Sequence, residues 1–292
     1  MRLRVACLLG VLLVAACGSD ATPVDRAEVP ADTGAADSST TMPPAPERTT
    51  PSIGVSTTTL PTNPRPDWLG TRVLPLRPDG LGEIQPTPAV LVDRRFATID
   101  LLPPPETDEF TSTIGPVPDA VLARSTWSQG CPVASDDLRY VTVMFRGFDG
   151  LAHTGELLVH ADAAEVMVAG FEHLYDRRFP IEEMRVTRAD ELDVPPTGDG
   201  NNTSAFVCRP SVGSTSWSQH AYGRAVDINP FHNPYVRGDV VIPELASSYA
   251  GRPDLPGVLR SDDVAGFTDQ GWGWGGTWRS SQDHMHLSAE NR

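Results

Sequence analysis

Residues 216–230 have the sequence SWSQHAYGRAVDINP, and residues 283–287, near the end of the chain, are DHMHL. The first stretch supplies an imidazole, His220, and a carboxylate, Asp227, beside a glycine that allows a close turn. The second stretch supplies another imidazole, His286. Two histidines and one carboxylate leave a fourth position for water, which is the usual arrangement of a catalytic rather than a structural zinc. The two stretches therefore predict a catalytic Zn²⁺ site.

A nearby carboxylate that does not bind the metal would complete such a site. Bound zinc lowers the pKa of its water to about 7, and a general base then carries the water proton to the leaving amine. Asp283 is the natural candidate, and its alternative role is to orient a ligand imidazole. In an extended strand His284 shares a face with His286, so it is expected either to hydrogen-bond an oxyanion or merely to pack. Spacing alone indicates this chemistry weakly, because His and Asp at such intervals are common.

The two stretches together resemble a known family. The pattern S-x-H-x-x-G-x-A-x-D, followed at a distance by D-H-x-H, is similar to that of the zinc D-alanyl-D-alanine carboxypeptidases, which include VanX- and VanY-type enzymes and phage L-alanyl-D-glutamate endolysins. In this chain the pattern is filled by Ser218, His220, Gly223, Ala225, Asp227, Asp283, His284 and His286. The resemblance covers roughly residues 160–292. It implies Zn²⁺ bound by His220, Asp227 and His286, with Asp283 as general base.

The family also places an arginine on a strand shortly before the first ligand, where it contacts the substrate and stabilises the oxyanion. Arg209 matches this position, and Arg185 is the alternative. The chain departs from the family at two points. Leu287-Ser288 stands where many members have an aromatic residue and Glu, and the base is Asp283 where some members have Glu. These departures leave the orientation of the substrate open, and the motif residues do not separate a D,D-carboxypeptidase from an endopeptidase.

A run of glycine and tryptophan at 271–278, GWGWGGTW, is expected to form an aromatic wall of the cleft as well as to fill the core. Within this run, Trp274 is the member that its position favours to face the substrate. Ser218 and Tyr222, on either side of His220, are expected at the substrate site, where they support the first ligand through hydrogen bonds. The other histidines are assigned no catalytic role: His232 is expected in a turn, and the sequence indicates no partner for His153, His160 and His173.

Hydrophobic patterning predicts an α+β fold with a small, mostly antiparallel sheet and a few helices around the zinc peptidase core. The expected strands, rich in β-branched and aromatic residues, are 138–145, its hairpin partner 155–160, and 181–186. Residues 162–178 are the best helix candidate, with Asp162 as N-cap. We expect one peptidase domain over 131–292, preceded by an extended segment at 69–130 to which the sequence assigns no role.

The N-terminus predicts export. A basic start and an apolar run lead to Cys17, so residues 1–17 are typical of a bacterial lipoprotein signal peptide with a lipobox cysteine, the alternative being an ordinary signal peptide. Residues 18–68 predict a disordered tether rich in Pro, Thr and Ser, because they have too little apolar surface to offset their ordering entropy. The expected location is the outer face of the bacterial cytoplasmic membrane, in the cell-wall space, with the chain held by lipid on Cys17.

The net charge limits the classes of partner that the chain could bind. The formal net charge is −15, with 38 acidic and 23 basic residues and no basic stripe, which argues against binding to nucleic acid. No interface signature is evident, so a monomer is the default expectation.

Of the four cysteines, Cys7 leaves with the signal peptide and Cys17 carries lipid. Cys131 and Cys208 remain, and in an exported protein such a pair predicts a disulfide, the alternative being two separate thiols.

These observations predict a zinc-dependent peptidoglycan peptidase that hydrolyses an amide next to D-amino acids in stem peptides. The first alternative is a non-catalytic peptidoglycan-binding lipoprotein that keeps a zinc site. Asp283 and Arg209 argue against it, because a pure binder needs neither. A surface adhesin displayed on a spacer is the second alternative, and it should hold no stoichiometric metal.

Overall fold

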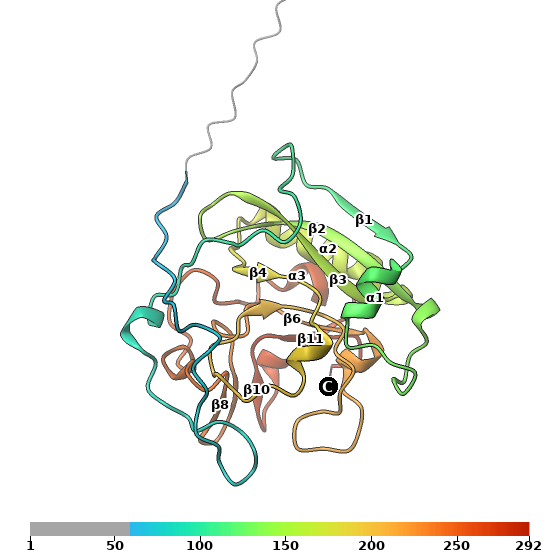
Figure 1. Ribbon diagram of the computed structural model, residues 1–292. Helices are drawn as coiled ribbons and strands as arrows, with labels where there is room; N and C mark the ends of the chain where they lie inside the picture. Colours follow the sequence, from blue (N-terminus) through green and yellow to red (C-terminus); the bar gives the residue numbers. More distant parts are fainter. Residues whose placement is uncertain (1–58, 292) are drawn as a thin grey trace, which may run out of the picture. The chain divides into compact units, whose positions relative to one another are not determined.

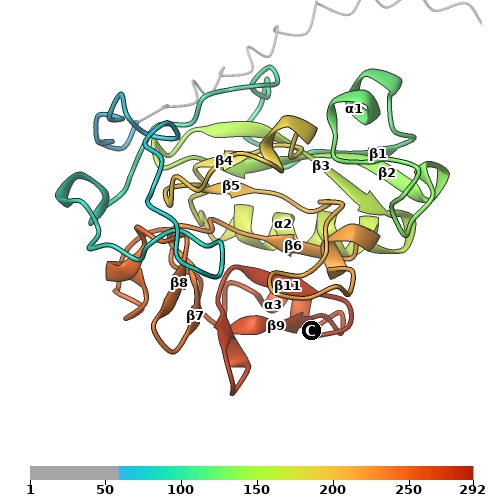
Figure 2. The same ribbon diagram turned by 60° about the horizontal axis from the view of Figure 1, so that its bottom comes forward.

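The computed structural model describes residues 59–291, which contain three α-helices and several small sheets (Figure 1 and Figure 2). The helices are α1 (Asp119–Arg124), α2 (Ala164–Asp176) and α3 (Ala265–Thr268). The strands are β1 (Ser112–Gly115), β2 (Leu138–Arg146), β3 (Ala152–His160), β4 (Glu183–Met184), β5 (Asn202–Thr203), β6 (Ala225–Asp227), β7 (Tyr235–Arg237), β8 (Val240–Ile242), β9 (Gly273–Trp274), β10 (Gln282–Asp283) and β11 (His286–Ser288). Sheets β1-β2-β3, β10-β7-β8 and β6-β11-β9 are antiparallel, whereas β4 and β5 are parallel. The predicted α+β class is confirmed.

β2 and β3 form a long hairpin that carries the main core. Val141, Val143 and Phe145, at alternate positions of β2, are buried in the cluster that contains α2, whereas Leu158 of β3 belongs to a cluster on the other face. This alternation is the period of two that a strand requires. The predicted strand and its hairpin partner are confirmed, although β3 begins earlier than expected, at Ala152.

α2 packs on this sheet and starts differently from the expected helix at 162–178. A 3₁₀ turn occupies residues 161–163, and the α-helix begins only after it. Asp162 as N-cap is wrong: the imidazole of His160 caps the turn, because its Nδ1 accepts a hydrogen bond from the Asp162 N–H at 3.2 Å. At the other end Arg178 has φ 55°, a left-handed conformation that ends the helix.

The predicted strand 181–186 is reduced to the two residues of β4, and the reason lies in its hydrogen bonds. Arg185 N–H donates to the Asn202 side chain at 3.0 Å, and Val186 N–H donates to the Glu156 carboxylate at 3.3 Å. Side-chain acceptors thus replace the main-chain acceptors of a neighbouring strand. The ladder ends with β4 for this reason.

Residues 59–101, which we call the strap, complete a second core. Figure 1 shows the strap, in blue and teal, passing near β8. Its Leu74, Leu91 and Phe96 are buried in one cluster with Phe231, Val241, Leu245, Ala246, Tyr249 and Val258. Its first residues are also bound, since Leu60 N–H donates to Asp149 O at 2.6 Å. The packed chain therefore includes residues 59–68 of the predicted tether; the remaining tether residues, the signal peptide and Cys17 lie outside the described residues.

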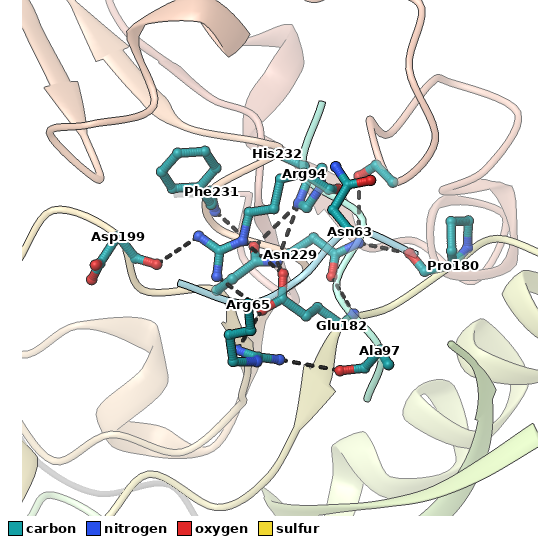
Figure 3. A network of polar contacts seen from close by, with 12 residues as sticks. Asn63, Arg65, Arg94, Ala97, Pro180, Glu182, Asp199, Asn229, Phe231 and His232 are labelled. Atoms are coloured by element: carbon teal, nitrogen blue, oxygen red, sulfur yellow. Dashed lines mark hydrogen bonds and ion pairs between the residues drawn. The ribbon is translucent and has the colours of Figure 1, made fainter. Parts of the chain in front are cut away.

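A buried ion pair joins the strap to the core (Figure 3). The side chain of Arg94 is 2% exposed and that of Glu182 is 1% exposed, and the guanidinium donates to both carboxylate oxygens at 2.7 and 2.9 Å. Arg65 and Asn201 donate further hydrogen bonds to the same carboxylate. His232 lies in a turn, as expected, and is buried in this network with its Nε2 2.9 Å from Arg94 O. Burial and the charge of Arg94 lower the pKa of His232 to about 4, so its ring is neutral at neutral pH.

The three histidines for which the sequence indicates no partner do have partners in the fold. His160 caps the turn before α2. His153 lies between two carboxylates, with Nδ1 2.8 Å from Asp100 and Nε2 3.1 Å from Asp149. His173 Nε2 lies 2.7 Å from the Asp262 carbonyl, 89 residues away in sequence. Such long separations explain why local patterns do not reveal these contacts.

The predicted disulfide between Cys131 and Cys208 is confirmed, and it links residues 77 positions apart. It connects the loop between α1 and β2 with the segment that precedes the first predicted ligand. None of the helices within residues 59–291 has the length and apolar character needed to span a bilayer.

Candidate metal and catalytic site

Two adjacent strands and one 3₁₀ helix bring the three predicted metal ligands together. β6 and β11 lie side by side in Figure 2, and their register places Asp227 directly opposite His286. His220 lies in the 3₁₀ helix Gln219–Tyr222, just before β6. Its Nε2 lies 3.1 Å from His286 Nδ1 and 3.2 Å from Asp227 Oδ1, and the latter two atoms are 3.1 Å apart. The fold thus forms one triangle of ligand-type atoms from residues as much as 66 positions apart.

The size and composition of this triangle fit a tetrahedral zinc ion. Bonds of about 2.0–2.1 Å in tetrahedral directions place ligand atoms roughly 3.3 Å apart, close to the three distances in this site. Two imidazole nitrogens and one carboxylate oxygen are also the donor set that leaves zinc a fourth position for water. On both grounds the residues present are suited to hold a catalytic zinc.

Hydrogen bonding and charge prepare these side chains for a cation. His220 Nδ1 lies 2.6 Å from Ala205 O, so this nitrogen carries the proton and the lone pair of Nε2 points into the triangle. Burial by itself raises the pKa of Asp227, but His220 and His286 together hold it well below its usual range. Asp227 is therefore a carboxylate, the form in which it binds a metal.

Gly223 explains why the motif has glycine three residues after His220. It ends the 3₁₀ helix in the left-handed region, with φ 68°. A Cβ at this position would lie 2.5 Å from His160 N and 3.0 Å from Val159 C, both main-chain atoms of β3. Glycine therefore permits both the turn and the close approach of the ligand-bearing segment to the main hairpin.

Replacing Gly223 by Ala is expected to lower the free energy of unfolding by about 3 kcal/mol, because backbone strain and a main-chain clash add together. Gly213→Ala is the matched control: Gly213 has φ 71°, but no atom lies within 4 Å of a Cβ there. This control should lose only about 1–2 kcal/mol. Urea unfolding of both variants measures the difference, and equal losses would show that the contact with β3 contributes nothing.

Asp283 lies in β10, close enough to the triangle to interact with its charges. Burial raises the pKa of Asp283 to about 7, the charge of Asp227 adds to the rise, and His286 and Arg209 oppose it. Its Oδ1 is buried without a hydrogen-bond partner in the described part of the chain. Gly275 borders it so closely that a Cβ there would lie 2.6 Å from Asp283 O. A carboxylate in this setting exchanges a proton near neutral pH, as a general base must.

The structure favours Arg209 over Arg185 as the arginine of the site. The charge of Arg209 lowers the pKa of Asp283, and its guanidinium makes no ion pair within the described residues but donates to the Pro210 carbonyl at 3.2 Å. The Arg185 guanidinium instead forms ion pairs with Glu183 and Glu191. The strand expected at Arg209 is wrong: the residue lies in a bend, and its N–H donates at 2.9 Å to a carbonyl only two residues back.

His284 does not share a face with His286, so the extended geometry assumed for it is wrong. Residues 284 and 285 form the turn between β10 and β11. The His284 ring centroid lies 6.3 Å from that of Trp274, and burial together with Arg252 and Arg260 lowers the pKa of His284 to about 4. Its Nδ1 is buried and has no partner within residues 59–291. His284 therefore belongs to the wall beside the site and not to the triangle.

Two tryptophans of the 271–278 run border the site in different ways. Trp274 packs against the main core, and its Nε1 donates to the His284 carbonyl at 2.9 Å. Trp278, which the sequence did not single out, lies half-buried with its ring centroid 5.7 Å from that of His286. The glycine-tryptophan run predicted an aromatic wall, but only the fold shows which tryptophan ring lies close to a metal ligand.

Ser218 and Tyr222 flank the first ligand at the two ends of its 3₁₀ helix. Ser218 is the N-cap, and its Oγ accepts a hydrogen bond from the His220 N–H at 3.3 Å. This contact is the support that the sequence predicts for Ser218. Tyr222 lies half-buried at the C-terminal end of the helix.

The site residues fall within a segment that matches a family model. Residues 212–289, about a quarter of the chain, match the model described as D-alanyl-D-alanine carboxypeptidase. Comparisons with curated proteins and with solved structures gave no match. The matched segment contains the whole triangle and Asp283, whereas Arg209 lies just before it. The resemblance drawn from the sequence is thereby confirmed: residues 212–289, which hold the candidate site, are similar to the D-alanyl-D-alanine carboxypeptidase family.

Proposed function

We propose that this chain is a zinc-dependent peptidoglycan peptidase that hydrolyses an amide next to a D-amino acid in stem peptides. One observation carries the proposal: the triangle of His220, Asp227 and His286 has beside it a buried carboxylate, Asp283, whose Oδ1 has no partner within the described range. The first three groups suit a metal ion, and the fourth suits a proton acceptor. A site that only held a structural metal would have no use for the fourth group.

Each residue of the site has a separate role in the proposed hydrolysis. His220, Asp227 and His286 would hold the zinc, which would supply a water of lowered pKa and polarise the scissile carbonyl. Asp283 takes the proton of the attacking water and passes it to the leaving amine. Arg209 stabilises negative charge that develops on the carbonyl oxygen. Trp278 covers one side of His286 and limits the access of bulk water there.

Zinc removal is expected to abolish hydrolysis and to reduce stability. To test this, the fragment 59–292 is loaded with one equivalent of zinc and incubated with defined pentapeptide and cross-linked muropeptides. Mass spectrometry then identifies the products. Loss of one alanine identifies a D,D-carboxypeptidase, whereas cleavage within a stem or cross-link identifies an endopeptidase. A chelator should stop either reaction, and zinc should restore it. No product from zinc-loaded protein on any of these substrates would contradict the proposal.

The rival readings differ in their expected metal and products. A non-catalytic peptidoglycan-binding lipoprotein would hold zinc and bind muropeptides without cleaving them. The raised pKa of Asp283 argues against it, since burying an unpaired carboxyl group lowers stability and brings a binder no benefit. A surface adhesin would purify without stoichiometric zinc, so metal analysis of protein prepared without chelators separates it from both zinc-binding readings.

We further propose that lipid on Cys17 anchors the chain to the outer face of the cytoplasmic membrane and that the tether carries the peptidase into the cell-wall space. Cys17→Ser is expected to remove the protein from the membrane fraction of a bacterial host while leaving the activity of the folded part unchanged. Fractionation and immunoblotting measure the change, with Cys7→Ser as the matched control that stays with the membrane. Membrane association that persists in Cys17→Ser would refute lipid anchoring at this residue.

A further inference from the structure

One short segment of the chain contacts the first ligand twice and then carries the site arginine. The Ala205 carbonyl accepts a hydrogen bond from His220 Nδ1 at 2.6 Å. Two residues later, Val207 N–H donates to the His220 carbonyl at 3.2 Å. Arg209 follows after another two residues. The position of residues 205–209 therefore bears on both a ligand and Arg209, to which the proposed function assigns the substrate carbonyl.

The two ends of this segment are held by different contacts. Near its start, Phe206 N–H donates to the Leu158 carbonyl of β3 at 3.1 Å. Near its end, Cys208 is held by the disulfide to Cys131, and its N–H donates to Thr126 Oγ1 at 2.9 Å. Cys208, the residue before Arg209, is thus held by the disulfide and by one side-chain hydrogen bond.

Beyond Arg209 the chain forms an exposed hairpin. Arg209 O accepts one hydrogen bond from Ser218 N–H at 3.3 Å, and a single bridge pairs Pro210 with Trp217. Between these two residues the chain forms a turn whose side chains are exposed. Ser211 N–H closes this hairpin by donating to the Ser216 carbonyl at 2.9 Å, but the exposed side chains of residues 211–217 do not anchor it on the buried core.

The partner of the disulfide, by contrast, is firmly attached. Cys131 lies in the loop between α1 and β2 and packs, with Trp127 and Cys208, against a cluster that includes Leu138 and Leu158 of the main hairpin. Trp127 Nε1 also donates to the Val133 carbonyl at 3.1 Å, which closes the loop on itself. The disulfide therefore ties Cys208 to a loop that is anchored on the β2–β3 hairpin.

We propose that the Cys131–Cys208 disulfide is a positioning element of the reaction, which holds Arg209 in place beside Ser218, the N-cap of the helix that bears His220, while the metal ligands are held by other contacts. The inference rests on the proposed function. His220 keeps its bond to Ala205 without the disulfide, because the Phe206–Leu158 bond secures that end of the segment. Arg209 loses its fixed neighbour when the disulfide is absent.

A double-mutant cycle tests this proposal. Cys131→Ser/Cys208→Ser is expected to bind zinc as tightly as the native chain but to lose between about 10- and 100-fold in kcat/KM, since a displaced catalytic group loses rate by such factors. Arg209→Ala should lose at least as much. Removing the disulfide from Arg209→Ala should then change kcat/KM less than twofold. In the background of Arg185→Ala, whose guanidinium is held elsewhere, disulfide loss should have its full effect.

The outcomes separate this inference from the proposed function. Equal losses in the native and Arg209→Ala backgrounds would show that the disulfide only stabilises the fold, and would overturn the inference. A large loss of zinc affinity in the serine variant would overturn it as well. If the serine variant does not fold, Thr126→Val weakens the same end of the segment with the disulfide intact, and the cycle is run with it. Failure of the proposed function has another signature: no hydrolysis by the native, zinc-loaded chain.

Discussion

Replacing Asp283 by Asn is expected to lower kcat by roughly 10²–10⁴-fold while zinc remains bound at one per chain. Asn has the shape of Asp but accepts no proton, so the substitution removes the general base and leaves the metal ligands in place. The effect should appear in kcat and in kcat/KM alike, because the proton transfer belongs to the transition state. Steady-state kinetics on the muropeptide that the native chain cleaves, together with metal analysis, measure both quantities.

The pH profile gives this prediction a second readout. Asp283 must be ionised to accept a proton, so the native rate should rise as pH increases through the pKa of this group. Burial and the charge of Asp227 raise that pKa to about 7 in the metal-free chain, and a bound cation lowers it. The acidic limb of kcat/KM is therefore expected at or below about pH 7, and it should be absent from the residual activity of Asp283→Asn.

Asp190→Asn is the matched control for this experiment. Asp190 is exposed, pairs with Arg188 and lies far along the chain from the site residues. Its replacement should leave kcat and the pH profile unchanged. Native activity in Asp283→Asn, or an acidic limb that persists in this variant, would show that another group serves as the base.

Much of the candidate site could be predicted because its residues lie in two short segments. Spacing alone indicated the chemistry weakly, but the family motif in these two segments named all three ligands, and the pairing of β6 with β11 places Asp227 opposite His286. His284 shows the limit of such reasoning. An alternating pattern assumes an extended backbone, but the chain turns at residues 284 and 285, and the side chain leaves the expected face. Trp278 could not be chosen over Trp274, because that choice depends on the path of the turn after β9.

The fold was predictable where hydrophobic periodicity is strong and local. The β2–β3 hairpin and α2 have such patterns, and they were found. Across residues 59–88 the strap shows neither the helix nor the strand period, because prolines divide this stretch into short pieces. Its order comes from contacts with residues far along the chain. Arg94, for example, pairs with Glu182 across 88 positions. Contacts at this separation leave no periodic signal in a single sequence.

The strap matters for the site because its buried ion pair adjoins the loop that follows Asp227. Asn229, two residues after that ligand, lies at φ 44°, and its Oδ1 accepts a hydrogen bond from the Glu182 N–H at 3.2 Å. Asn201, which donates to the Glu182 carboxylate, also accepts a hydrogen bond from Phe231 N–H at 2.9 Å. The network around Glu182 thus fixes the turn on which β6 ends.

Arg94→Met is expected to lower the free energy of unfolding by about 3–5 kcal/mol, the usual loss when one partner of a buried ion pair is removed. Arg65 remains near the carboxylate of Glu182, but it is partly exposed and makes a single bond at 3.2 Å. Arg188→Met is the control: this arginine pairs with Asp190 and its side chain is 55% exposed, so the loss should stay below about 1 kcal/mol. Urea unfolding of the zinc-free proteins measures both.

The way in which the stability loss of Arg94→Met changes with pH shows whether the ion pair causes it. Burial alone raises the pKa of Glu182, but Arg94 holds it below its usual range, so in the native chain this group adds stability above the pKa of an unfolded Glu and loses it as pH falls. Without Arg94, burial dominates and raises the folded pKa. The loss of stability in Arg94→Met should therefore be larger at pH 8 than at pH 5. At pH 8 the folded chain must bury either an unpaired carboxylate or a carboxyl group that stays protonated although it would ionise in the unfolded chain, and both cost free energy. Adding Glu182→Gln should recover part of the lost stability at pH 8, since a neutral side chain then occupies the buried position. If the loss is independent of pH, or if Glu182→Gln recovers none of it, the loss comes from packing and not from the ion pair.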